Sequence, residues 1–311
     1  MLSLFRKRDA AIRHAVVPLD RGVAFAEVDR RGEARPRLVR CGFVPNGDDA
    51  AAALARAVRA CGARQAPVST LLDVGSYNLL LVEMPRVPPE EMRQAVRWQV
   101  RDLIDFHIDD AVIDVFDAPA SAARGVQDHL YVVAARKALV QERVDALAAA
   151  GAKLGVIDIP ELALRNLAAL LEEDREGVAL LYLGDDSGLI ALCRQGVLYL
   201  ARTLALGQVR VSEALAGGDE QLLGSLALEI QRTLDYYDRH FQQAPIGRLA
   251  VAPLAFDGAP LTESIQSQLG LQSRMIDLCQ TLECETTPDA ETASQVTLAV
   301  AAALRQETRS L

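Results

Sequence analysis

The chain opens with short apolar segments separated by turn residues. Residues 15–17 and 23–26 are apolar and flank Asp20-Arg21-Gly22. Asp and Gly adopt the backbone conformations that tight turns need, so this pattern predicts a β-hairpin over residues 14–28. A further apolar segment, 37–44, predicts a third strand beside it.

Helix-forming and strand-forming patterns then alternate. Residues 50–61 have helical periodicity and end at Gly62, a residue that commonly terminates helices. A helix is also predicted to begin near Pro89, with Trp98 on the face opposite its apolar residues. The apolar face is predicted to contain Met92, Val96, Val100, Leu103 and Ile104. The remaining elements predicted in this part are strands at 69–74, 79–84, 111–117, 129–135 and 156–159, and helices at 138–150 and 161–171.

The charged stretch 172–177 marks a change, after which the order of elements starts again. Three strands are predicted at 178–183, 189–193 and 197–204. A long helix at 224–241, a strand at 249–253 and helices at 261–269 and 294–304 are predicted to follow. We therefore expect an α/β fold of two related halves, 1–174 and 175–311, with a small subdomain of about 80–135 inserted in the first. Ligands commonly bind in the cleft between such halves.

Composition narrows the function classes. The 311 residues carry a formal net charge of −9, and 5% are aromatic, which argues against a nucleic-acid-binding protein. The four histidines are scattered, so we expect no metal site. The five cysteines have irregular spacing, which favours a reducing compartment and free thiols over a disulfide framework.

The sequence shows neither a secretory signal nor a membrane span. The basic segment 1–9 is followed by no apolar signal region, and no stretch approaches the roughly 20 apolar residues of a membrane span. The sequence therefore predicts a cytoplasmic protein.

Four segments in chain order carry a resemblance to a known family. Met84-Pro85 followed by Glu90–Gln99 is similar to the family pattern MP…EEL..AVRWE, with 104–107 in place of its Pro-Phe-Pro stretch. Val132–Lys137 is similar to LLVAARKE. Residues 149–161 and Leu228–Tyr237 are similar to two further family segments, the second being EIQRSLQFY. The chain thus resembles the PilM family of type IV pilus proteins, and especially MshI of the mannose-sensitive haemagglutinin pilus.

The resemblance implies an actin-like fold, of the actin-like ATPase superfamily, with two RNase H-like halves around a nucleotide cleft. It also implies a cytoplasmic scaffold of the pilus assembly platform. Such a scaffold binds the N-terminal tail of a bitopic inner-membrane protein, PilN or its counterpart MshJ, and meets other platform proteins. Association with the membrane would then be indirect, through these partners.

The residues that the resemblance assigns to the nucleotide cleft depart from the family pattern. The hydroxyl-rich run after the first turn is replaced by Val23-Ala24-Phe25, and the metal-side carboxylate of the second hairpin by Tyr182. Pro253-Leu254 replaces a Gly-Gly turn, which removes an N–H and adds a side chain where a ligand needs space. Asp185 and Asp186 add negative charge with no basic partner beside them in the sequence. The cleft residues so assigned are Asp20, Gly22, Gly184, Asp185, Ser187 and Gly188.

These departures predict a degenerate site, no catalytic residues and no cofactor, with weak ATPase activity left open. The alternatives are a PilM-type protein that binds ATP and Mg²⁺, and a cytoplasmic component of a type II secretion system like GspL. The second alternative differs by continuing into a membrane span and a periplasmic domain.

Partner binding is predicted on the helix that begins near Pro89. Trp98 is the best single candidate, because tryptophan is enriched in binding hot spots. The alternative is that strands of the same subdomain cover its ring. A tail of the Asn-Leu-Leu-Pro type needs apolar pockets and backbone hydrogen bonds. The residues predicted to bind it are Arg97, Trp98, Arg101 and Phe106.

Overall fold

The computed structural model describes residues 12–31, 35–63, 66–119 and 129–306. The basic segment 1–9 lies outside these residues. Within the described part of the chain, no helix has the length and apolar character needed to cross a lipid bilayer.

The first sheet is built around the predicted hairpin. Its strand order is β14-β3-β2-β1-β4-β8, with antiparallel pairing from β3 to β1 and parallel pairing from β1 to β8. The β1–β2 turn falls at Asp20 and Arg21, as predicted. The strands are β1 (Ile12–Leu19), β2 (Gly22–Asp29), β3 (Arg37–Pro45), β4 (Pro67–Leu71), β8 (Lys153–Asp158) and β14 (Glu283–Cys284).

Two helices cover one face of this sheet, α2 (Ala50–Cys61) and α4 (Lys137–Ala149). The α2 helix begins at the Asp49 cap, whose side chain accepts a hydrogen bond from the Ala52 N–H, and it ends at Gly62 with φ +74°. Both ends follow from local chemistry, because an N-terminal Asp satisfies a free N–H and glycine tolerates the left-handed conformation.

The second sheet repeats the topology of the first. Its order is β11-β10-β9-β12-β13, again three antiparallel strands followed by two parallel ones. This repetition confirms the predicted duplicated α/β fold. The strands are β9 (Val178–Leu183), β10 (Gly188–Arg194), β11 (Val197–Leu204), β12 (Arg248–Val251) and β13 (Gln272–Met275).

Three helices accompany the second sheet, α6 (Gln208–Gly217), α7 (Glu220–Phe241) and α8 (Ala259–Leu269). Apolar residues of all three join a core on one face of the sheet. Every residue of β9 is buried: Val178, Leu180 and Tyr182 point into the core between the sheets, and the intervening residues point into the α6–α8 core. A strand covered on both faces has no polar face, which explains its unbroken apolar sequence.

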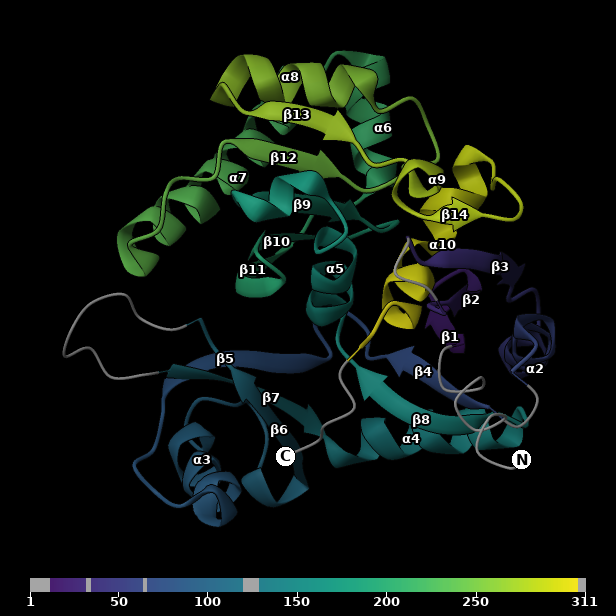
Figure 1. The fold of residues 1–311 in the computed structure, drawn as a ribbon, viewed down its shortest axis with the longest axis vertical. Helices are drawn as coiled ribbons and strands as arrows, with labels where there is room; N and C mark the ends of the chain where they lie inside the picture. Colours follow the sequence, from purple (N-terminus) through teal and green to yellow (C-terminus); the bar gives the residue numbers. More distant parts are fainter. Residues whose placement is uncertain (1–11, 32–34, 64–65, 120–128, 307–311) are drawn as a thin grey trace.

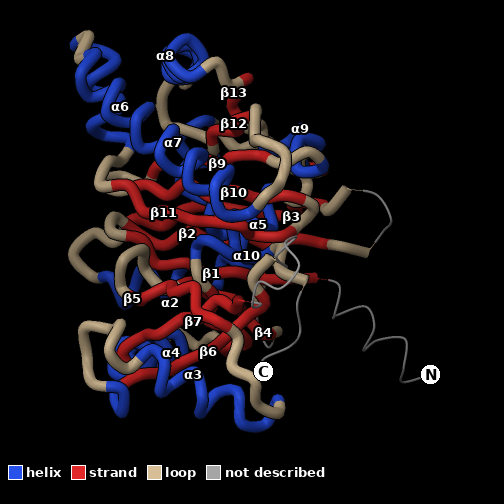
Figure 2. Tube along the Cα trace, turned by 90° about the vertical axis from the view of Figure 1, so that its left-hand side faces the viewer, coloured by secondary structure: helices blue, strands red, loops and turns tan. Residues whose placement is uncertain are grey.

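Two helices lie between the sheets, α5 (Pro160–Ala168) and α10 (Ala290–Ala303). Figure 2 shows them among the strands in the middle of the molecule, with α3 and α8 towards its ends. Residues from both sheets and both helices form one continuous core. Every residue of Val296–Ala303 is buried. The two halves are therefore joined by a shared core.

A small subdomain is inserted between β4 and α4. Its sheet has the order β5-β7-β6, and α3 (Met92–Val100) packs on one face through Val96 and Val100. Figure 1 shows it at the opposite end of the molecule from α8. Its strands are β5 (Tyr77–Glu83), β6 (Ala111–Asp117) and β7 (His129–Arg136), and two 3₁₀ turns, η1 (Pro89–Glu91) and η2 (Ile108–Asp110), flank α3.

Several features differ from the sequence expectations. The helix α6 and strand β13 were not expected, and the C-terminal segment returns to the first half, where β14 pairs with β3 and α10 packs on the first sheet. The boundary between 174 and 175, which falls at the 3₁₀ turn η3 (Glu172–Arg175), stays a prediction. Leu103 is 56% exposed, because α3 ends at Val100 before its apolar face reaches that residue.

The cysteines also depart from expectation. Cys279 and Cys284 form a disulfide that connects the short helix α9 (Leu278–Thr281) to β14, whereas the other three cysteines are free. The preference for free thiols therefore holds for three of the five cysteines and is wrong for this pair. A pair five positions apart, with four residues between the cysteines, matches no common spacing motif, which explains why the sequence did not indicate it.

We expect the disulfide to be detectable by alkylation. Unfolding the protein in guanidinium with iodoacetamide and no reductant should modify the three free cysteines, Cys41, Cys61 and Cys193. Prior reduction should add Cys279 and Cys284, as read by mass spectrometry. Modification of all five without reductant would contradict the bridge.

We also expect enlargement of a residue between the sheets to destabilise the fold. Ala299 is fully buried on α10, so Ala299→Leu should lower the free energy of unfolding by about 1–3 kcal/mol through overpacking. Ala290→Leu, at the exposed start of the same helix, is the matched control and should change it by less than about 0.5 kcal/mol. Urea unfolding measures both, and equal effects would contradict the shared core.

Candidate functional site

A cleft lies between the two halves, at the turns of their leading hairpins. Its volume is about 490 Å³, and its wall includes the β1–β2 turn, the β9–β10 turn and the first residues of α6. The duplicated topology explains this position, because each half begins with the same hairpin and the shared core holds the two sheets against each other.

Four of the six predicted cleft residues line this cavity, namely Asp20, Gly184, Asp185 and Ser187. Gly22 and Gly188 do not. A Cβ on Gly22 would collide with the Phe43 ring and the Val44 carbonyl oxygen. A Cβ on Gly188 would lie 2.8 Å from Leu183 Cδ2 and 2.9 Å from the Leu206 carbonyl oxygen. These two glycines are thus required by packing within the protein.

Asp185 has a basic partner, which corrects the sequence expectation. The Arg21 Nε atom lies 3.1 Å from Asp185 Oδ2, so the two hairpin turns are joined by an ion pair across the cleft. The Arg21 side chain is 64% exposed, and a pair this accessible contributes about 0–1 kcal/mol. The interaction is nonlocal, which is why the sequence alone did not reveal it.

Gln208, at the start of α6, connects three further segments. Its Nε2 donates to Asp185 Oδ1 at 3.2 Å. Its Oε1 accepts from the Ala255 N–H at 3.2 Å and from the hydroxyl of Ser294 at 3.3 Å. Ser294 lies on α10, which packs on the first sheet, so Gln208 bridges the two halves. We did not predict this residue, because α6 itself was not predicted.

Two of the residues that depart from the family pattern, Tyr182 and Leu254, lie in different surroundings. Tyr182 lines the cavity but is only 8% exposed, and burial together with Asp185 and Asp20 raises the pKa of its phenol. A neutral hydroxyl therefore stands where the resemblance implies a carboxylate. Leu254, in contrast, is buried in the core of the second half and is not part of the cavity wall. The expectation that its side chain fills ligand space is wrong.

The cleft is acidic. The carboxylates in its wall outnumber the single guanidinium, Arg21, and Arg21 is already paired with Asp185. Asp73 is paired as well, with Arg143 outside the cleft, at 2.8 Å. Across the described residues no group of three or more His, Cys, Asp or Glu is placed to hold a metal ion. The carboxylates in the wall are Asp20, Asp73, Asp185, Asp186, Glu213 and Glu291.

The predicted partner-binding residues lie in the small subdomain, where two of the predicted aromatic rings each lie beside a guanidinium. The Trp98 side chain is 66% exposed, and the Arg101 guanidinium lies 5.5 Å from its ring centroid. The alternative that strands cover Trp98 is therefore wrong. The Phe106 ring lies under the Arg136 guanidinium at 4.5 Å.

Arg97 has a structural role that the sequence did not indicate. Its guanidinium donates to the Ile108 carbonyl oxygen at 2.7 Å and to the Ala111 carbonyl oxygen at 3.4 Å, and it pairs with Asp109 at 3.6 Å. These contacts connect α3 to η2 and β6. Trp98 and Arg101 are thus the exposed members of the predicted set.

Comparison with known proteins gives a family and a fold. A family model described as type IV pilus assembly protein PilM matches residues 43–217, more than half of the chain. None of the curated proteins matches the chain.

Several solved structures are similar. The structure of a PilM-PilN type IV pilus biogenesis complex matches with a TM-score of 0.74 and 22% identity, over 94% of this chain and 97% of the other. The cytoplasmic domain of EpsL from the Vibrio cholerae type II secretion system matches with a TM-score of 0.53 and 14% identity, over 95% and 96%. A Bacteroides thetaiotaomicron protein with an actin-like ATPase fold matches with a TM-score of 0.51 and 8% identity, over 96% of this chain and 99% of the other. At these identities the likenesses establish the actin-like fold.

The bridge made by Gln208 predicts a measurable stability difference. Gln208→Ala removes the partner of the buried Ser294 hydroxyl and of the Ala255 N–H, so the free energy of unfolding should fall by about 1–3 kcal/mol. Gln295→Ala is the control, because Gln295 also lines the cleft and, among the described residues, its side chain bonds to Glu291 alone, one turn earlier on the same helix. Thermal unfolding measures the stability of both variants. If Gln208→Ala is as stable as the parent and as Gln295→Ala, the bridge is contradicted.

Proposed function

Because the chain belongs to the PilM family of type IV pilus assembly proteins, we propose that it is a non-catalytic scaffold that binds the tail of a PilN-like inner-membrane protein. The observation that carries the proposal is the family match over residues 43–217, which includes α3 and the β9–β10 turn. The solved PilM-PilN complex, which shares this fold, supports a PilN-like partner.

We further propose that the chain serves one type of type IV pilus. The segments quoted above favour the mannose-sensitive haemagglutinin type of pilus, with an MshI-like role for this chain and an MshJ-like partner. We propose a cytoplasmic position at the inner membrane, held through that partner and other platform proteins.

The partner surface centres on Trp98 and Arg101. A tryptophan ring that is 66% exposed and stacked near a guanidinium offers both apolar area and a hydrogen-bond donor to an extended peptide. Arg97 and Phe106 lie in the same subdomain, where Arg97 holds η2 against α3 and the Phe106 ring lies beside the Arg136 guanidinium.

The cleft is proposed not to bind ATP productively. A triphosphate would meet the carboxylates of Asp20, Asp185 and Asp186, while the nearby Arg21 is already engaged by Asp185. The glycines that could admit phosphate oxygens, Gly22 and Gly188, are instead packed against the protein's own atoms. The charge and the packing therefore both oppose a polyanion.

We expect Trp98→Ala to weaken binding of a synthetic PilN-like N-terminal tail by about tenfold or more, because a hot-spot tryptophan contributes at least about 2 kcal/mol. Fluorescence anisotropy with the labelled peptide measures the affinity. Leu228→Ala is the matched control, since Leu228 is 49% exposed on α7. Unchanged affinity in both Trp98→Ala and Arg101→Ala, with folding intact, would move the site elsewhere.

Calorimetric titration with Mg-ATP should give no saturable binding in the micromolar range. The carboxylates of the cleft wall repel the phosphates, and Arg21 is already paired with Asp185. Micromolar binding would overturn the degenerate-site proposal and favour an ATP-binding PilM-type protein.

A further inference from the structure

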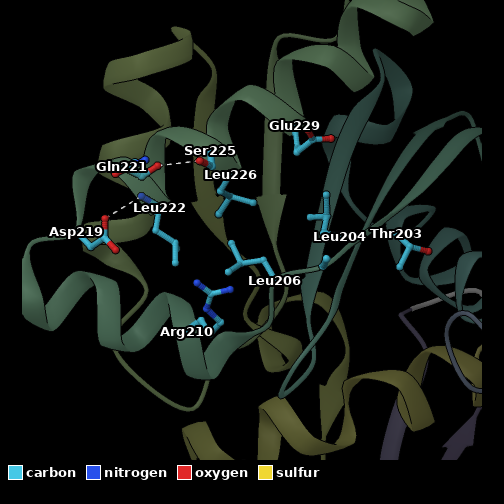
Figure 3. Close-up of a pocket in the computed structure, with 11 residues that line it drawn as sticks. Thr203, Leu204, Leu206, Arg210, Asp219, Gln221, Leu222, Ser225, Leu226 and Glu229 are labelled. Atoms are coloured by element: carbon cyan, nitrogen blue, oxygen red, sulfur yellow. Dashed lines mark hydrogen bonds between the residues drawn. The ribbon is translucent and has the colours of Figure 1, made fainter.

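A second hollow lies entirely within the C-terminal half, beside α7. Its volume is about 580 Å³, larger than that of the cleft, and the two cavities share no described residue. The end of β11, the connection after it, the α6 helix and the first half of α7 form its wall. Figure 3 shows the side chains converging on it from these elements.

The floor of this groove is apolar. Leu204 and Leu226 are buried and belong to the core of the second half, and Leu206 packs against that core. Leu222 does not join the core, and Figure 3 shows its side chain directed into the hollow. An apolar side chain held in a hollow gains contacts only when something else fills the space.

The charged side chains at the rim of the groove differ in whether they have a bonding partner. Asp219 caps α7 by accepting from the Leu222 N–H at 3.0 Å. Glu229 is paired with Arg202 at 3.5 Å and with Arg232 at 2.6 Å. The exposed Arg210 guanidinium, in contrast, forms no hydrogen bond or ion pair with any described residue, and it points towards the hollow. Among the charged side chains of the groove wall, Arg210 is therefore the one that has no hydrogen-bond or ion-pair partner among the described residues.

The shape of the groove favours an elongated occupant. Gln221, Ser225 and Glu229 lie one turn apart along one side of α7, so the wall runs for about 12 Å along the helix. A second helix fits such a groove between α6 and α7, with apolar side chains spaced one turn apart facing the leucine floor.

We propose that this groove, defined by Leu206, Arg210, Leu222 and Leu226, docks an amphipathic helix of a partner protein that carries a carboxylate beside its apolar face. The apolar side chains pack against the half-buried Leu206 and Leu222, above the buried Leu204 and Leu226, and the carboxylate pairs with Arg210. The groove is separate from the Trp98 surface of the small subdomain, so a scaffold built this way holds two different partners at once.

The test uses the full chain and a designed helical peptide with two leucines one turn apart and a glutamate one further turn along. Fluorescence anisotropy should show saturable binding. Arg210→Glu should weaken it by about tenfold or more, the factor that corresponds to one charge-assisted hydrogen bond. The same variant should bind the lysine version of the peptide better than the parent does. Arg239→Glu, the same charge change at an exposed position on α7 outside the groove, should leave binding unchanged.

Other outcomes would overturn the proposal. Absence of binding, or equal affinity in the Arg210 and Arg239 variants, removes the groove as the docking site. If decanoate binds in an Arg210-dependent manner and the peptide does not, the occupant is a small amphiphile. If Arg210→Glu converts a dimer of this chain to monomer in sedimentation, the groove is a contact between copies. Leu222→Asp should abolish peptide binding while Trp98→Ala leaves it intact, which separates this surface from the proposed PilN-like site.

Discussion

The packing of α5 and α10 between the two sheets is the interaction on which the rest of the structure depends. The buried side chains of α10 are mostly small, whereas α5 contributes leucines as well as alanines, and together they fill the space between the sheets. The polar groups enclosed there are bonded, with Asn166 donating to the Ala301 carbonyl oxygen at 3.5 Å and Arg305 paired with the buried Asp158. Because one core serves both halves, their hairpin turns lie on the same side of that core, and the cleft is formed between them.

Within that cleft, the protein's own side chains make the connections between the halves. Arg21 reaches Asp185 from the opposite turn, and Gln208 joins Asp185, Ala255 and Ser294. In an actin-like protein that uses a nucleotide, the ligand would contact both halves at this place. Here Arg21 and Gln208 are engaged by the protein's own groups, and carboxylates outnumber the one guanidinium in the cleft wall, which is unfavourable for a polyanion.

Local chemistry made much of the fold predictable. The Asp20-Arg21-Gly22 turn, the end of α2 at Gly62 and the unbroken apolar strand β9 all follow from residues close in sequence. The elements that were missed are short or irregular in pattern, such as α6 and β13, or depend on distant partners, such as β14 on β3. The same division applies to the sites. The exposure of Trp98 agrees with its helical face, whereas the pairing of Arg21 with Asp185 and the bridge made by Gln208 arise only when separate turns meet.

The central claim is that this chain binds its membrane partner without help from a nucleotide. The most direct measurement is the affinity of the full chain for the PilN-like tail with and without saturating Mg-ATP. The account predicts the same dissociation constant in both conditions, because the acidic cleft, in which Arg21 is already paired with Asp185, does not bind the nucleotide. A change of tenfold or more on adding Mg-ATP would contradict it, since by linkage the nucleotide would then have to bind the same molecule.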